Sequence, residues 1–144
     1  QPSISQFLSG RIEMSDDLLG RLLSCLGYRL EVVRRPVRVD LGRSRERSWR
    51  LHRQLATHLD PEVLEGWVPT TRRNLDRLRL TTQGEPHVSN LTRWELLVDL
   101  RDVAGLRSVM TGVDPHSVEM REVSPLGGLL PQDERSRVLA GVSA

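Results

Sequence analysis

The sequence predicts a mainly α-helical chain, with short helices at the N-terminus, one short strand and then a helical C-terminal domain. Apolar residues recur at spacings of three and four residues through most of its length, which is the period of an amphipathic helix. Ser, Asp or Pro stands at the start of several of these stretches, where helices favour capping side chains and proline. Only one segment alternates with the period of a strand.

A short helix is expected over residues 2–9. Pro2 suits the first turn of a helix, because its missing N–H needs no partner there, and Gly10 suits the position after the last turn. The opposite face of this segment is polar, so the helix would pack on a scaffold with only one side. Its apolar side chains are Ile4, Phe7 and Leu8.

A second helix is expected from Ser15 to Gly27. The Ser15 hydroxyl can cap it, and Asp16 and Asp17 lie in the first turn, where the helix dipole favours negative charge. The single cysteine, Cys25, lies among leucines and is expected to be a small buried hydrophobe. One cysteine forms no intrachain disulfide, which fits a reducing, cytoplasmic location.

Residues 28–43 are expected to form a short strand and a linker. The strand segment alternates in part and is rich in β-branched and aromatic residues. A lone strand cannot satisfy its own backbone N–H and C=O groups. The simplest partner is the same strand of a second copy. The sequence therefore predicts a homodimer with Tyr28, Leu30 and Val32 at its interface.

The pattern from residue 44 to residue 144 predicts a helical domain. Asp60-Pro61-Glu62 combines a cap, a proline at the first position and an acid in the first turn, and so marks a helix start. Pro69 is expected to break or kink that helix. The other expected helices begin near residue 44, cover 89–102, 103–111 and 114–121, and start again near Pro131.

The charge pattern indicates an anionic partner. The net charge is only +2, but all 21 basic residues are arginine, which stays charged and binds phosphates and carboxylates through two parallel hydrogen bonds. Nine arginines lie between Arg29 and Arg53 against three acids, which favours a nucleic acid or an acidic protein as partner. A solvated helix surface explains the same run equally well.

The segment Gln1-Pro2-Ser3-Ile4-Ser5-Gln6-Phe7-Leu8-Ser9-Gly10-Arg11 resembles the recognition helix of XRE-family regulators, the Cro or phage-repressor type of helix-turn-helix protein. Residues 14–28 match the loop and helix that follow it in that family. Glutamine can pair with adenine, serine can contact several bases or a phosphate, and an arginine past the helix suits a phosphate. The DNA-binding residues that the resemblance implies are Gln1, Ser3, Ser5, Gln6, Ser9 and Arg11.

Two helices and a turn precede the recognition helix in this family, whereas the present chain begins at Gln1. Residues 1–27 are therefore expected to be the C-terminal part of a helix-turn-helix domain. Without its scaffold the recognition helix lacks part of its packing face. We expect operator DNA to be a partner of the full-length protein, and this chain alone to bind DNA weakly or not at all.

The C-terminal part is similar to the helical domain that such regulators carry in actinobacteria, with Met120-Arg121-Glu122-Val123-Ser124-Pro125-Leu126-Gly127-Gly128-Leu129-Leu130 as one matching segment. The similarity implies a type II antitoxin, of the VapB type or a similar one, which represses its own operon and neutralises a cognate toxin. That toxin could be a PIN-domain ribonuclease, whose carboxylate-rich site an inserted arginine would block, or a nucleotidyltransferase. The implied partner-binding residues are Leu126, Leu129, Leu130, Arg135, Arg137, Val138 and Leu139.

Alternatives stay open at each level of this interpretation. The leucines could simply pack on the core of their own domain. The protein could be a stand-alone XRE-family regulator whose C-terminal domain senses a small molecule, or an interaction scaffold without a DNA role. An adjacent nuclease gene would favour the antitoxin over the first alternative. Loss of operator binding on changing the recognition helix would exclude the second.

The residues indicate no enzyme. The four histidines have no metal-ligand spacing and no companion cysteines, and no phosphate loop or nucleophile motif is present. Glu95 and Asp99 lie four residues apart and could hold a divalent ion, but an ion-paired helix face is the expected explanation. No cofactor and no metal are expected. No apolar run of about 18 residues predicts a membrane span.

Overall fold

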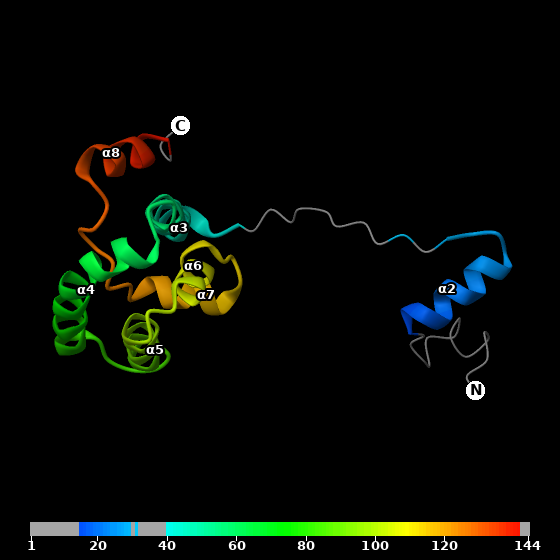
Figure 1. Cartoon of the computed structure of the whole chain (residues 1–144), viewed down its shortest axis with the longest axis horizontal. Coiled ribbons are helices and arrows are strands. Elements are labelled where there is room, and N and C mark those ends of the chain that lie inside the picture. The colour runs from blue at the N-terminus through cyan, green and yellow to red at the C-terminus, as the bar shows by residue number, and fades with distance from the viewer. Residues whose placement is uncertain (1–14, 30, 32–39, 142–144) are drawn as a thin grey trace. The chain divides into compact units, whose positions relative to one another are not determined.

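The computed structural model describes residues 15–29, 31 and 40–141 (Figure 1). The chain divides into two units, residues 1–38 and residues 39–144. Seven helices make up most of the described ranges, and no strand occurs in them. The mainly α-helical class predicted from the sequence is therefore confirmed.

The N-terminal unit contains helix α2, Asp16–Cys25. As expected, the Ser15 hydroxyl caps it by accepting a hydrogen bond of 3.3 Å from the N–H of Leu18. At the other end Gly27 adopts a φ of 78°, and the N–H groups of Gly27 and Tyr28 donate to carbonyls of the last turn. This pair of bonds is the Schellman arrangement, which satisfies carbonyls that a helix end leaves free.

The strand expected from Tyr28 onwards is not seen, since Tyr28, Arg29 and Glu31 are described and none lies in a strand. The backbone N–H of Tyr28 is bonded at 2.8 Å to a carbonyl of α2, and its side chain is 68% exposed. The prediction was wrong because the helix cap uses the donor that a strand ladder would need. Leu30 and Val32, also predicted at the dimer interface, lie outside the described residues.

Cys25 is exposed, so the expectation of a buried cysteine was wrong. The leucines beside it in sequence do not surround it, because no residue of α2 is buried among the described residues. The last turn of the helix, which carries Cys25, therefore has no core around it.

The C-terminal unit is built from six helices between residues 40 and 141. Three of them begin at an aspartate whose carboxylate accepts a backbone N–H three residues further on, at 2.8 Å for Asp60, 2.8 Å for Asp102 and 2.9 Å for Asp114. Each bond satisfies a donor that the first turn leaves free. The helices are α3 (Gly42–Ala56), α4 (Pro61–Thr81), α5 (His87–Asp99), α6 (Val103–Thr111), α7 (Pro115–Glu122) and α8 (Gln132–Ala140).

The core of this unit lies among α3, α4, α5, α6 and α7, with α4 packed on α5 and α8 at the edge against α3 (Figure 1). Trp94 is fully buried in the core, and its indole N–H donates to the carbonyl of Met120 at 2.7 Å. That bond satisfies the one donor of the ring, so the large apolar surface is buried without an orphan polar group. The same core contains Leu55, Leu64, Leu75, Leu91, Val98, Leu106 and Met110.

Pro69 does not break α4, which continues from Pro61 to Thr81 as one helix. Proline removes a single backbone bond and crowds the preceding turn. Leu64 and Val68 before it and Leu75 after it are all buried. Packing on both sides therefore holds the helix together across the proline. Of the two predicted effects, the break was wrong and the kink stays a prediction.

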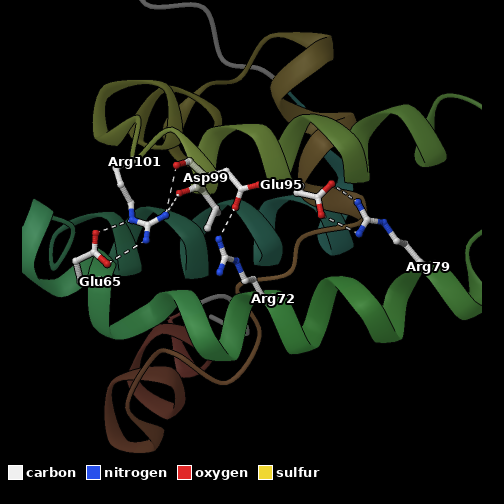
Figure 2. A network of polar contacts seen from close by, with 7 residues as sticks. Glu65, Arg72, Arg79, Glu95, Asp99 and Arg101 are labelled. Carbon is white, nitrogen blue, oxygen red and sulfur yellow. Dashed lines mark hydrogen bonds and ion pairs between the residues drawn. The ribbon is translucent and has the colours of Figure 1, made fainter.

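Three ion pairs join α4 to α5 and to the turn that follows α5 (Figure 2). Glu95 and Asp99 are each held by an arginine of α4, which is the ion-paired explanation expected from the sequence. The side chains are more than one-third exposed, so each pair contributes at most about 1 kcal/mol and mainly orients the two helices. The pairs are Arg79–Glu95 at 2.5 Å, Arg72–Asp99 at 2.8 Å and Arg101–Glu65 at 2.5 Å.

Candidate functional site

The C-terminal unit contains an open hollow of about 730 Å³ between α3 and the chain from Arg121 to Arg135. We call it the α3 hollow. It brings together four of the seven residues predicted to bind a partner, namely Leu126, Leu129, Leu130 and Arg135. The rest of its lining is formed by Leu51, His52, Leu55, Arg121, Glu122, Ser124, Gly127, Gly128, Pro131 and Gln132.

The segment between α7 and α8 is held in place by polar bonds to its backbone. The side-chain amide of Asn74 in α4 donates to the carbonyls of Pro125 and Gly127 at 2.8 and 2.9 Å. Gly128 adopts a φ of 83°, which L side chains rarely adopt, so the glycine permits the turn here. Leu126 is 5% exposed and belongs to the core, so it packs on its own domain.

His52 of α3 and Ser124 form a hydrogen-bonded pair in the hollow wall. Imidazole Nδ1 lies 2.7 Å from the carbonyl of Ser48, so Nδ1 must carry the proton. Nε2 of the neutral ring is then the acceptor for the Ser124 hydroxyl at 2.7 Å. Burial, with a smaller contribution from the Arg121 charge, lowers the pKa of His52 to about 4. Such a weak base is better suited to hold the segment than to activate the hydroxyl.

Arg121, at the end of α7, is the most deeply buried charge of the hollow wall. Its side chain is 4% exposed, and Nη1 donates to the carbonyls of Val109 and Gly112 at 2.7 and 2.6 Å. Nη2 is buried and has no hydrogen-bond partner among the described residues. Burial lowers the pKa of Arg121, and the nearby Asp114 carboxylate opposes that shift. The group still remains charged near neutral pH.

The outer edge of the hollow combines an arginine with apolar side chains. Arg135, in the first half of α8, is exposed, and its guanidinium forms no hydrogen bond or ion pair within the described part of the chain. Leu129 and Leu130 are half-buried and pack against the core from outside. The edge therefore presents one free cation beside partly covered leucines, which suits an acidic and partly apolar group.

The other predicted partner-binding residues lie apart from the α3 hollow. Arg137 and Val138 line a second hollow of about 430 Å³, together with Arg50, Arg53 and Gln54 of α3. Arg137 is paired with Asp133 at 2.9 Å, and Leu139 is half-buried. α8 is fixed to α3 by Glu134, which accepts hydrogen bonds at 2.9 Å from Gln54 and at 2.7 Å from His58. These bonds lower the pKa of Glu134.

Several arginines of the basic stretch, residues 29–53, contact other side chains of the C-terminal unit. Arg45 pairs with Glu122 at 2.7 Å, Arg50 pairs with Glu46 at 2.7 Å, and the guanidinium of Arg53 lies over the Trp49 ring. These contacts stabilise α3 and its packing on α7, which agrees with the interpretation of the stretch as a solvated helix surface. The residues predicted to contact DNA, from Gln1 to Arg11, lie outside the described residues.

Sequence reasoning missed Arg121 and Ser124 as functional candidates and assigned His52 a structural role. Each of the two missed residues lies in the segment that resembles the regulator domain, but the resemblance singles out neither of them. The hydrogen-bond partner of Ser124 lies 72 residues away in the sequence, and those of Arg121 lie 9 and 12 residues away. The local sequence pattern therefore does not identify these partners.

Comparison with known proteins gives no relative, since no family model, no curated protein and no solved structure matches this chain. Among the residues that the structure describes, no group of three or more His, Cys, Asp and Glu side chains could hold a metal ion. None of the described helices has the length and apolar character needed to cross a membrane.

Proposed function

We propose that this chain belongs to a DNA-binding transcriptional repressor that acts as an antitoxin, and that its C-terminal unit binds the cognate toxin. The N-terminal segment, with its resemblance to an XRE-family recognition helix, would bind the operator. Residues 39–144 would hold the partner at the outer edge of the α3 hollow. The full-length protein would bind both and repress its own operon.

The observation that carries the proposal is the free guanidinium of Arg135 beside Leu129 and Leu130. A protein interface takes its binding energy from a few anchors of this kind, an arginine and apolar side chains around it. A nuclease with a carboxylate-rich site, such as a PIN-domain ribonuclease, offers the matching charge, because a guanidinium can bind a carboxylate through two parallel hydrogen bonds.

Arg135→Ala in the full-length protein should weaken its complex with the product of the neighbouring gene. Losing a charged anchor at an interface weakens binding by about tenfold or more. The measurement is co-expression followed by affinity purification, with the amount of bound partner compared between variants. Arg73→Ala is the matched control, because Arg73 is an exposed arginine of α4 that lines neither hollow. A full-length protein that purifies alone would contradict the proposal.

Gln1→Ala combined with Gln6→Ala should abolish operator binding by the full-length protein, because glutamine reads adenine edges in the major groove. Electrophoretic mobility shift with the operon's own promoter measures the effect. The partner complex should be unchanged in the same variant. Operator binding that survives both substitutions would contradict the role of the recognition helix and favour a scaffold without a DNA role.

A second candidate function, a stand-alone regulator that senses a small molecule, is favoured by the size of the α3 hollow. Its volume of about 730 Å³ lies within the range of small-molecule sites, and its lining is mixed apolar and polar as in such sites. A promoter whose repression responds to a small molecule, with no partner protein retained on purification, would support this candidate.

A further inference from the structure

A buried positive charge lies in the wall of the α3 hollow without a counter-charge. The guanidinium of Arg121 is bonded only to two backbone carbonyls through Nη1. Its Nη2 is buried without a hydrogen-bond partner in the described ranges. Taking a charged group out of water costs free energy that only a paired charge or further hydrogen bonds can offset. The fold thus contains a buried cation that forms no ion pair within the described part of the chain.

The acids nearest to Arg121 are engaged elsewhere. Glu122 also lines the hollow, but its carboxylate is paired with Arg45 at 2.7 Å. Asp114 caps α7 and accepts the Ser117 hydroxyl at 2.6 Å. No carboxylate of the described chain lies within ion-pair distance of Arg121. Arg121 therefore has Asp114 as a nearby charge but no direct ion pair within the described chain.

The remaining lining of the hollow is mostly apolar. Leu51 and Leu55 contribute from α3, and Leu126, Leu129 and Leu130 contribute from the segment before α8. His52 is neutral and its Nε2 accepts the Ser124 hydroxyl, so neither group adds a second charge. Arg135 adds a free cation at the opening. The hollow thus offers one buried cation, one cation at its edge and an apolar surface between them.

We propose that the α3 hollow binds a small amphipathic carboxylate, whose carboxylate pairs with Arg121 and whose apolar body packs on the surrounding leucines. A guanidinium and a carboxylate match in charge and geometry, and the ligand would supply the ion-pair partner that Arg121 does not have within the described chain. A phosphate ester fits less well, because it needs several free donors around one group, whereas Arg121 and Arg135 are the charged donors of this lining that form no ion pair within the described chain.

The probe pair is decanoate and 1-decanol, which share a ten-carbon chain and differ in charge, with acetate as a carboxylate that has no apolar body. Isothermal titration calorimetry on this 144-residue chain measures the binding, below the concentration at which decanoate forms micelles. Decanoate should bind about tenfold or more tightly than decanol, because a hydrogen bond to a charged group is lost in the alcohol. Acetate should bind weakly.

Arg121→Met removes the charge and keeps the length, and should weaken decanoate binding by about tenfold while leaving decanol unchanged. Arg107→Met is the matched control, because Arg107 also donates to a backbone carbonyl, that of Leu59 at 2.6 Å, but does not line the hollow. If Arg121→Met fails to fold by circular dichroism, the comparison of decanoate with decanol on the unaltered chain decides alone.

Equal binding of decanoate and decanol, or no binding of either, would overturn the inference. So would full decanoate binding by a folded Arg121→Met variant. Binding of the carboxylate does not depend on either proposed function. Only a role of that binding in regulation rests on the small-molecule candidate function. Binding is measured without DNA and without a partner protein, so its failure leaves the repressor and antitoxin proposal standing, and the reverse also holds.

Discussion

His52 and Arg121 show how two basic side chains in one wall take different protonation states. The imidazole can lose its proton, and burial together with the neighbouring guanidinium keeps it neutral, with its pKa lowered to about 4. The guanidinium cannot lose its proton near neutral pH, so it stays charged although removing it from water costs free energy. The neutral ring then accepts the Ser124 hydroxyl, and the guanidinium donates to the carbonyls of Val109 and Gly112.

The free energy of unfolding should decrease as the pH falls from about 6.5 towards about 4, because the unfolded chain binds a proton at His52 before the folded chain does. The stabilisation is complete above the unfolded pKa and is lost through this window. His52→Asn should show a shallower decrease between pH 7.5 and pH 4.5 in urea unfolding. His116→Asn, at an exposed histidine, serves as control. Equal slopes for wild type and His52→Asn would contradict the account.

Element boundaries were predictable where one local interaction sets them. Ser15 and Asp60 were recognised as caps in the sequence, and each accepts a backbone N–H of the first turn. The strand at Tyr28 is not seen in the described residues, because the N–H of Tyr28 completes the cap of α2. The helix is not broken at Pro69, because buried side chains lie on both sides of the proline, and these come from packing that the local pattern does not show.

Two glycines inside helices give opposite predictions. A Cβ at Gly66 in α4 would meet nothing within 4 Å, so Gly66→Ala should stabilise by about 0.5–1 kcal/mol through helix propensity. A Cβ at Gly105 in α6 would collide with the side chains of Asp102 and Leu97, so Gly105→Ala should destabilise by about 1–3 kcal/mol and disturb the cap. Urea unfolding of both variants checks the signs. A destabilised Gly66→Ala would show that α4 does not continue as described.

At the scale of the whole molecule, the structure brings together only some of the residues that the sequence predicted to bind a partner. Leu129, Leu130 and Arg135 were expected at a partner surface, and they do line one hollow. Arg137 and Val138 were expected with them and instead line another hollow, which α3 also lines. The pattern of a single helix cannot show which of its residues meet α3, because that depends on contacts such as those of Glu134 with Gln54 in α3 and with His58 just after it.

We propose that the C-terminal unit binds its partner at the outer edge of the α3 hollow. This can be measured by hydrogen–deuterium exchange of the full-length protein, alone and bound to the product of the neighbouring gene. Exchange should slow on binding over residues 124–140 and over the part of α3 that lines the hollow. Protection confined to the ion-paired face of α4 and α5, with residues 124–140 unchanged, would contradict it.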